Sequence, residues 1–578
     1  MKTIFNLQLL VLLLLFGLIS CHKDTTKVGF SETIRFEDSD GLETSTYDEV
    51  IAFYEDIAEH SSEISIDAMG KTDSGNPLHL VSISKNKNPS NLNLLINNGI
   101  HPGESDGIDA SMLLLKDIVN GHIKLPDNIN LYIIPSYNIG GMLNRNSTSR
   151  ANQNGPKAYG FRGNARNFDL NRDFIKMDTK NMEAFASIFH KIKPDVYVET
   201  HVSNGADYQY TLTHLLTQHN RLCYHLGDYL ESDFKVKLKD SLARKGHMIT
   251  PYVNVYGRTP EGGFSQFMDY PRYSTGYTSL WNTLGLMIET HMLKPYKNRV
   301  LATKDMLETL MAISSIDAEK IQLAKANTTD QFLADNYYKF NFKIDSTRHE
   351  RLDFKGYEAE IMTSEVTGKP RLKFNRDKPY TKSINYYNQF KALDSVKIPD
   401  YYVIKKGWDR ILTHLALNEI AYEIVINDTV MAVEGYRISD YNTYTSPYEG
   451  HYPHYNTKVF STPLQLEVKT GDVIVPVRQS GIKYILETLE PEMNDSFFNW
   501  NFFDTILQQK EGFSGYVFED YAFEFLDENP DVKAEFEALK TNDEEFGNNA
   551  YAQLNWIFKR SPLYEEAHLN YPVYRVFD

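Results

Sequence analysis

The stretch NNGIHPGESDG, residues 97–107, places a His and a Glu three positions apart directly after an apolar run. Imidazole nitrogens and carboxylate oxygens are zinc ligands, and a site with three protein ligands leaves the fourth position for water, as catalytic zinc sites do. The spacing alone is weak evidence, because the chain also contains His60-Ser-Ser-Glu63. The position of each His/Glu pair in the fold must therefore decide which of the two could bind a metal.

Short apolar runs alternate with amphipathic helical patterns from about residue 46 to residue 300. Near-continuous hydrophobicity is typical of strands buried on both faces, and segments 107–121 and 182–193 have helical periodicity. We therefore predict an α/β domain with a largely parallel sheet and helices on both sides. A capping box at Thr46-Tyr-Asp-Glu49 is expected to open its first helix. The expected strands span residues 78–84, 92–98, 129–137, 195–202 and 284–291.

Chemically useful side chains stand at the carboxyl ends of three of these strands. His101 follows one strand by two residues, and His201 and Glu289 close two others, whereas His60 lies at the polar end of a helix. Functional residues gather at this edge of such sheets. Pro102-Gly103 fits a tight turn that aims both flanking side chains at one ion. A metal site is predicted; the alternative is that His201 hydrogen-bonds at the sheet rim and Glu104 caps a helix.

Five short motifs follow one another along the first half of the chain: Gly75-Asn-Pro-Leu78, His101-Pro-Gly-Glu104, Asp169-Leu-Asn-Arg-Asp-Phe174, Thr200-His201 and Ile288-Glu289-Thr290. In type and order they resemble the motifs of zinc carboxypeptidases of the carboxypeptidase A type, the funnelin family. The resemblance covers about residues 46–300 and implies a mixed, largely parallel eight-stranded sheet flanked by helices.

The resemblance also implies roles for individual residues. One zinc ion per chain would be bound, with Glu289 as the general base. Asp169 would orient a ligand His, and an Arg, either Arg145 or Arg150, would polarise the scissile carbonyl. The remaining implied residues are the zinc ligands His101, Glu104 and His201, the pair Asn171 and Arg172 that holds the substrate carboxylate, and an active-site Tyr among Tyr270, Tyr273 and Tyr277, with Tyr273 as the candidate.

These roles imply a metallocarboxypeptidase that hydrolyses the C-terminal residue of peptides with zinc-activated water. Two departures, Asn138-Ile-Gly-Gly141 and Asp173, remove no ligand but point to an altered substrate preference. An amidase or deacylase of the same superfamily, acting on cell-wall peptides or N-acyl amino acids, is the alternative. A non-catalytic surface-binding lipoprotein is a third possibility.

The beginning of the chain has the features of a lipoprotein leader. Residues 1–20 form an apolar signal peptide, and Leu18-Ile19-Ser20-Cys21 resembles a bacterial lipobox. We expect cleavage before Cys21, lipidation of its thiol, a polar tether over residues 21–45, and anchoring to the bacterial cell envelope. An ordinary signal peptide or an uncleaved signal anchor is the alternative. Cys223 would then be the remaining thiol, and no intrachain disulfide could form.

The second half of the chain has a different composition. We predict a helical connection over residues 301–335, a mainly β domain over 336–485 and a mixed aromatic and acidic region over 486–578. The pair His451 and His454 has a Pro between its members and no nearby third ligand, so we interpret it as part of a Tyr-rich loop. A net charge of −17 argues against nucleic-acid binding. The sequence indicates no oligomeric state.

Overall fold

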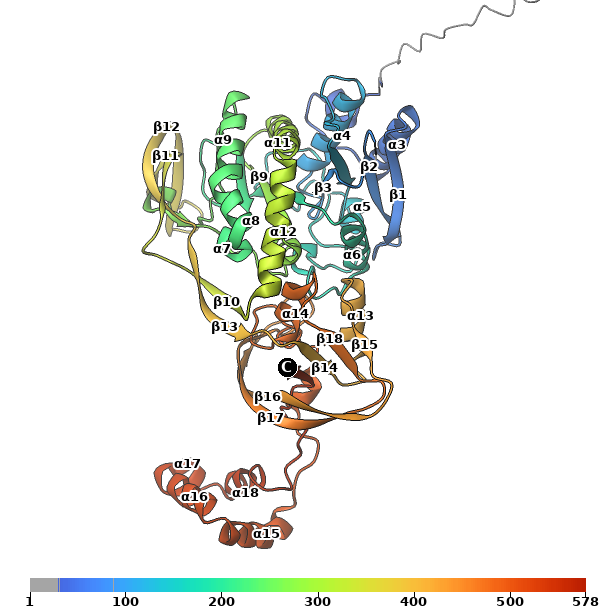
Figure 1. Ribbon diagram of the computed structural model, residues 1–578. Coiled ribbons are helices and arrows are strands. Elements are labelled where there is room, and N and C mark those ends of the chain that lie inside the picture. Colours follow the sequence, from blue (N-terminus) through green and yellow to red (C-terminus); the bar gives the residue numbers. More distant parts are fainter. Residues whose placement is uncertain (1–29, 31, 87, 578) are drawn as a thin grey trace, which may run out of the picture.

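A computed structural model describes residues 30, 32–86 and 88–577. An eight-stranded mixed sheet forms the centre of the first half of the chain, as predicted (Figure 1). Its strands are β1 (Ile64–Lys71), β2 (Pro77–Ile83), β3 (Leu92–Asn97), β4 (Ile129–Ile134), β5 (Val196–Ser203), β6 (Leu212–Leu216), β7 (Ile249–Pro251) and β9 (Leu284–His291). Their order is β1-β2-β4-β3-β5-β9-β6-β7.

The four central strands β4, β3, β5 and β9 are mutually parallel. Every residue of β5 and of β9 is buried. This explains why hydrophobic and polar residues do not alternate in their sequences, as they do in a strand with one solvent-exposed face. Because the strands are parallel, their carboxyl ends meet at one edge of the sheet. The register sets His201 of β5 directly opposite Glu289 of β9.

Helices cover both faces of this sheet. Apolar side chains of α3, α4, α9 and α11 form one core with the sheet, and those of α6 and α10 belong to the core on the other face. The helix α3 begins with the predicted capping box of Thr46 and Glu49, and it ends at the exposed His60. The helices are α2 (Arg35–Asp38), α3 (Tyr47–His60), α4 (Asp106–Val119), α5 (Ile139–Leu143), α6 (Lys180–Ile192), α7 (His219–Leu222), α8 (Tyr224–Tyr229), α9 (Lys235–Arg244), α10 (Ser274–Thr278), α11 (Tyr296–Ile316) and α12 (Ala318–Ala334), with short turns η1 (Leu170–Arg172), η2 (Leu230–Phe234), η3 (Pro260–Gly262) and η4 (Ser279–Trp281).

Two segments that we expected to be connections pack against the domain. Residues 32–45 belong to the predicted tether, yet Ile34 and Phe36 are buried in the core beside α3, and Arg35 pairs with Glu43. The helix α11, in the predicted connection, packs on α4 and contributes to the same core. The signal peptide and Cys21 lie outside the described residues. No helix within the described part of the chain is long and apolar enough to cross a membrane.

The second half of the chain is mainly β, as predicted. Its strands form a six-stranded sheet with order β15-β18-β14-β19-β16-β17, a ribbon of β10 with β13, and a three-stranded sheet β11-β12-β8. The bounds are β8 (Phe264–Ser265), β10 (Tyr337–Ile344), β11 (Glu350–Thr363), β12 (Pro370–Tyr387), β13 (Phe390–Lys397), β14 (Tyr401–Ile404), β15 (Glu423–Ile424), β16 (Thr429–Thr443), β17 (His454–Val468), β18 (Val473–Pro476) and β19 (Val573–Val576), with α13 (Asp409–Leu417), α14 (Ile482–Leu489) and η5 (Asp504–Leu507).

The region after residue 486 divides into two parts with different surroundings. Four helices form a small unit with a hydrophobic core of its own, and Figure 1 shows this unit standing apart from the rest of the molecule. The chain then returns, and β19 enters the six-stranded sheet between β14 and β16. The four helices are α15 (Gly515–Glu528), α16 (Pro530–Asn542), α17 (Glu544–Gly547) and α18 (Ala550–Phe558).

The β region and the domain of the eight-stranded sheet share one hydrophobic core. The cluster that covers the α6 face of the central sheet, including Phe185 and Tyr197, continues into Tyr484 of α14 and Trp500. Trp281, after α10, packs against Tyr484 with ring centroids 5.4 Å apart. This continuous core fixes the position of the β region relative to the central sheet.

Gly107 in the first turn of α4 allows that helix to lie directly on β5. A Cβ at this position would come within 2.0 Å of Thr200 Oγ1. We expect Gly107→Ala to destabilise the fold by ~1–3 kcal/mol through overpacking and to lower Tm by roughly 2–10 °C. Gly512→Ala is the control, because nothing lies within 4 Å of the added Cβ. Equal Tm values for the two variants in calorimetry would contradict this packing argument.

Candidate metal centre and active site

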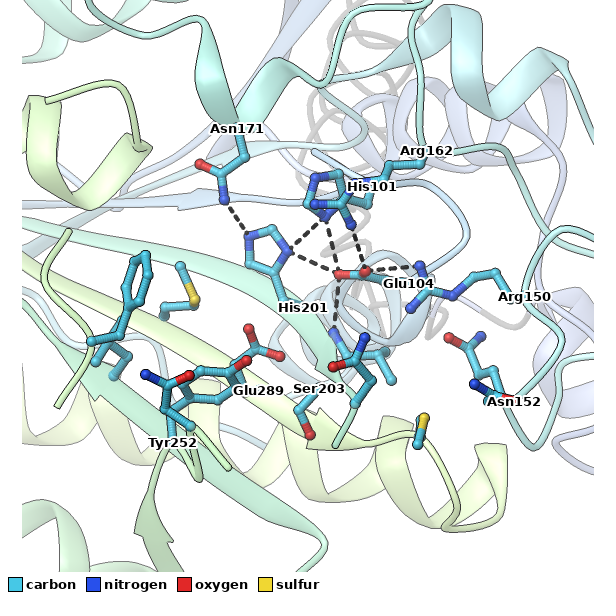
Figure 2. A pocket seen from close by; sticks show the side chains of 18 of the residues that line it. His101, Glu104, Arg150, Asn152, Arg162, Asn171, His201, Ser203, Tyr252 and Glu289 are labelled. Carbon is cyan, nitrogen blue, oxygen red and sulfur yellow. Dashed lines mark hydrogen bonds and ion pairs between the residues drawn. The ribbon is translucent and has the colours of Figure 1, made fainter. Parts of the chain in front are cut away.

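A pocket of about 710 Å³ opens at the carboxyl ends of the central strands (Figure 2). Its lining comes from the loop after β3, the end of β5, the end of β9 and the long irregular segment between β4 and α6. The pocket thus collects residues that are up to 191 positions apart, from His101 to Met292. The predicted residues that line it are His101, Glu104, Arg150, Asn171, Arg172, His201, Tyr273 and Glu289.

Three of these residues direct ligand atoms at one point. His201 Nδ1 lies 3.1 Å from His101 Nδ1 and 2.9 Å from Glu104 Oε2, and the third separation, His101 Nδ1 to Glu104 Oε2, is 3.3 Å. Ligand atoms placed tetrahedrally at 2.0–2.2 Å from zinc are roughly 3.3–3.6 Å apart, so these three atoms would have to move apart by only a few tenths of an ångström to hold the ion. All three side chains are buried. The separations and the donor types therefore fit one zinc ion.

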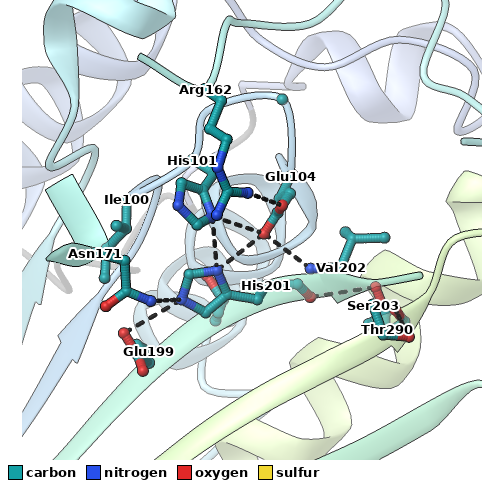
Figure 3. Close-up of polar contacts among 12 residues, drawn as sticks. Ile100, His101, Glu104, Arg162, Asn171, Glu199, His201, Val202, Ser203 and Thr290 are labelled. Atoms are coloured by element: carbon teal, nitrogen blue, oxygen red, sulfur yellow. Dashed lines mark hydrogen bonds and ion pairs between the residues drawn. The ribbon is translucent and has the colours of Figure 1, made fainter. Parts of the chain in front are cut away.

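Each imidazole has a carboxylate at its Nε2, and Figure 3 shows Glu199 in this position at His201. His101 Nε2 lies 2.9 Å from Asp169 Oδ1, a position from which this carboxylate can orient the ring. His201 Nε2 lies 3.2 Å from Glu199 Oε2, which also accepts a hydrogen bond from the Ser274 hydroxyl. A carboxylate at Nε2 places the proton there and leaves Nδ1 free as a ligand. Sequence reasoning missed Glu199, although its position two residues before His201 on the same face of β5 was a usable signal.

The electrostatics of this centre favour a cation. Burial alone would lower the pKa of His201, but Glu199 and Glu104 raise it to about 10. Burial would raise the pKa of Glu104, but Arg150 and His101 lower it well below its usual range. The Glu104 carboxylate therefore stays ionised, and positive charge beside it is strongly stabilised. A divalent cation at the three ligand atoms would be stabilised by the same negative charges.

Glu289 faces the pocket without a partner of its own. Its Oε2 atom is buried and has no hydrogen-bond partner among the described residues. Burial raises the pKa of the Glu289 carboxyl above its usual value, and the carboxylates of Glu104 and Glu199 act in the same direction. Lys294, the neighbour with which a purely structural Glu289 could pair, instead donates to the Tyr208 carbonyl. A carboxyl group that proton transfer requires is therefore available at the metal centre.

The two Arg candidates occupy different surroundings. Arg150 lines the pocket, and its Nη1 lies 2.8 Å from Glu104 Oε1. Arg145 donates to the backbone carbonyls of Thr44 and Ser45 and does not line the pocket, so its inclusion among the catalytic candidates is corrected. The two residues are five positions apart on an irregular loop, where no periodicity predicts which one points inward.

Gly103 serves the site for a reason that differs from the predicted one. Gly103 does not have a positive φ, so its backbone conformation is open to any residue and does not require glycine. A Cβ at Gly103 would instead meet Arg150 Cδ at 2.5 Å and the Gly160 carbonyl oxygen at 2.9 Å. Gly103 is therefore required by the close passage of Arg150 above it.

Arg162, which sequence reasoning missed, is a second arginine that contacts the acidic residues Asp169 and Glu104. Arg162 contacts Asp169 Oδ2 through Nη2 at 2.8 Å, and its Nη1 lies 3.7 Å from Glu104 Oε1. It lines the pocket and is partly exposed. The residue lies in the segment between β4 and α6, without regular secondary structure or spacing to mark it.

Asn171 and Arg172 lie beside the metal centre, on the turn η1. Asn171 Nδ2 lies 3.4 Å from His201 Nε2, and Asn171 Oδ1 accepts from the Ser274 backbone N–H. The Arg172 guanidinium lies over the Tyr273 ring, 4.5 Å from its centroid. Tyr273 lines the pocket, whereas the other two candidates, Tyr270 and Tyr277, do not.

Two further tyrosines line the pocket and were missed. Tyr252 and Tyr256 follow β7, and their hydroxyls lie 2.7 Å apart. Tyr256 is exposed, while Tyr252 is close enough to Glu289 for that carboxylate to raise its pKa, after the larger effect of burial. The apolar part of the lining includes Leu215, Phe267 and Met287.

Comparison with protein families gives a match at this domain. Residues 50–205 match the zinc carboxypeptidase model, Peptidase_M14. The match includes His101, Glu104, Asp169 and His201, and ends before Glu289. No curated protein matches the chain.

Solved structures with a similar fold include bacterial and insect enzymes. A metallo-carboxypeptidase from Burkholderia cenocepacia is 15% identical, with 47% of this chain and 69% of that chain covered, at a TM-score of 0.36. A metallo-carboxypeptidase from Pseudomonas aeruginosa is 14% identical, covering 47% and 68%, also at 0.36. Carboxypeptidase A from Helicoverpa armigera is 13% identical, covering 49% and 73%, at 0.35. The match over residues 50–205 and the His-Glu-His centre within it together show a zinc carboxypeptidase domain of the Peptidase_M14 type in this chain.

Proposed function

We propose that this enzyme removes the C-terminal residue from peptides that end in a free carboxylate. The observation that carries the proposal is the content of a single pocket. The zinc ligands, the unpartnered Glu289, and the Asn171–Arg172 pair all line it. A cavity that is lined both by ligands for a metal and by a guanidinium beside them can take the last peptide bond and the terminal carboxylate of the same substrate.

The substrate carboxylate would bind at Arg172. A guanidinium matches a carboxylate bidentately, and Asn171 adds an amide donor. The Tyr273 ring under Arg172 supports the guanidinium from one side. Leu215, Phe267 and Met287 form an apolar lining nearby, which favours a terminal residue with an apolar side chain.

Zinc, when bound, supplies a Lewis acid that polarises a carbonyl and lowers the pKa of water to about 7. Glu289 would accept the proton from the attacking water and then donate it to the leaving nitrogen, as a general base and acid. Its burial favours the second step, because a carboxyl with a raised pKa holds a proton long enough to transfer it. Arg150 would donate to the carbonyl oxygen as negative charge develops there.

Membrane attachment is a separate proposal, and it rests on the leader sequence. We propose that the enzyme is exported and anchored to the bacterial cell envelope through a lipid on Cys21. The support is the apolar run before Leu18-Ile19-Ser20-Cys21 and the single short basic flank. The short stretch from Cys21 to the packed segment at Ile34 would hold the catalytic domain close to the membrane surface.

Replacement of Glu289 should separate catalysis from metal binding. We expect Glu289→Gln to lower kcat by about 10²–10⁴-fold, because the proton acceptor is lost, while about one zinc per chain remains. Peptide trimming followed by mass spectrometry, together with elemental analysis of zinc, measures both. Glu319→Gln on the exposed side of α12 is the matched control. Undiminished trimming by Glu289→Gln would remove this residue from the mechanism, and release of residues from C-terminally amidated peptides would favour the amidase alternative.

Replacement of Glu199 should weaken zinc binding without removing a ligand. We expect Glu199→Gln to lower zinc affinity by about 10–100-fold, because the neutral amide no longer supports the His201 ring as a carboxylate does. Competition with a chelator such as dipicolinate measures the affinity. Glu183→Gln, at an exposed position of α6, should bind zinc as the wild type does. An unchanged affinity in Glu199→Gln would show that Glu199 does not support the metal centre.

Lipidation can be tested at the leader. We expect cells grown with radioactive palmitate to label the wild-type protein, because lipoprotein processing attaches acyl chains to the Cys that becomes the first residue after cleavage. Cys21→Ala should abolish the label and release the protein from the membrane fraction. Cys223→Ala, which changes the other thiol of the sequence, should keep the label. Equal labelling of Cys21→Ala and the wild type would disprove the anchor.

A further inference from the structure

The loop between β16 and β17, residues 444–453, reaches from the six-stranded sheet to the segment that carries the substrate-binding residues. Its sequence is YTSPYEGHYP. It contacts segment 168–178, which contains Asp169, Asn171 and Arg172, although some 280 positions separate the two in sequence. This loop contains the first His of the pair His451 and His454.

Glu449 contacts the backbone of the residue that orients a metal ligand. The Asp169 N–H donates to Glu449 Oε2 at 2.8 Å. Asp169 in turn contacts His101 through its side chain, and its Oδ1 accepts from the Asn171 N–H to cap η1. Glu449 therefore fixes the backbone from which both the orienting carboxylate and the turn η1 project.

Tyr448 contacts the residue that would bind the substrate carboxylate. Burial would lower the pKa of Arg172, but Asp169, Tyr273 and Tyr448 raise it, which places Tyr448 beside that guanidinium. The Tyr448 ring also lies over the Arg272 guanidinium, 5.8 Å from it, and Arg272 is held by the buried Asp495. Arg172 thus has Tyr273 from the catalytic domain on one side and Tyr448 from the β region as a further partner.

The remaining loop contacts fix its position. His451 Nε2 lies 2.7 Å from Asp178 Oδ2, and Asp178 also pairs with the fully buried Lys176. Lys176 pairs with Asp173 as well, the residue that departs from the family pattern. His454 instead contacts Thr443 and Asp504, so the two His do not form a metal site. Gly450, with a φ of +81°, brings the loop backbone against the Phe168 ring, which a Cβ would meet at 3.1 Å.

We propose that Tyr448 and Glu449 are positioning residues of the active site, through which the β region holds Arg172 and Asp169 in place for the substrate carboxylate. This inference rests on the proposed carboxypeptidase function. Neither residue lines the pocket, so each acts through its partner on segment 168–178. The β region is thereby a component of the substrate site.

The test compares four variants of the full-length protein with the wild type, on a peptide that the wild type trims. We expect Tyr448→Phe and Glu449→Ala each to raise KM by about three- to tenfold, the size expected for one lost polar contact, with kcat changed less than KM. Zinc content and Tm should stay at wild-type values. Glu449→Gln should restore KM, since the amide oxygen still accepts from the Asp169 N–H. Tyr452→Phe is the control, because Tyr452 is exposed on the same loop.

The outcomes separate this inference from the proposed function. If the wild type trims peptides and the KM of Tyr448→Phe and of Glu449→Ala equals that of the wild type, the positioning role is wrong and the function stands. Loss of zinc and a parallel fall in kcat and Tm in these variants would reduce the two residues to a structural role and overturn the inference. If the wild type trims no peptide with a free carboxylate, the function and the inference fall together.

Discussion

Two imidazole nitrogens and a carboxylate oxygen meet within 3.3 Å of one another in a buried place, and the rest of the structure serves that convergence. Each ring can present Nδ1 only if its Nε2 is held, so Asp169 and Glu199 stand behind the two His. These carboxylates need partners in turn, which Arg162 and Ser274 provide. Each layer of charged or polar residues around the metal centre therefore needs a further layer of partners, because an unpaired buried charge is costly.

The sequence predicted those parts of the site that depend on regular structure. Continuous apolar runs marked β3, β5 and β9, and the rule that useful residues gather at the ends of parallel strands brought His101, His201 and Glu289 together. Periodicity ends where the irregular segment between β4 and α6 begins. The choice between Arg145 and Arg150, and the part played by Arg162, depend on the path of that segment, which its residue types do not specify.

Long-range contacts were the other part that sequence reasoning could not reach. Glu449 touches Asp169 across 280 positions, and no local pattern links the two. The same limit applies to the segment around Ile34 and Phe36, which looks polar on average yet buries these two side chains in the core beside α3. Composition averages over a segment, whereas packing depends on which of its few apolar residues find a cavity.

The strand order of the six-stranded sheet determines when the substrate site can be completed. β19 pairs with β14 and reaches β16, and the buried Arg575 of β19 contacts Glu490 and Glu434. The sheet that supports loop 444–453 is therefore incomplete until a strand has arrived that is separated from β18 by the whole excursion through α15–α18. The support of the carboxylate-binding turn therefore depends on a strand that is remote from it in sequence. Damage to β19 would leave the eight-stranded sheet and its metal ligands unaltered in sequence but would remove a strand from the sheet that holds loop 444–453.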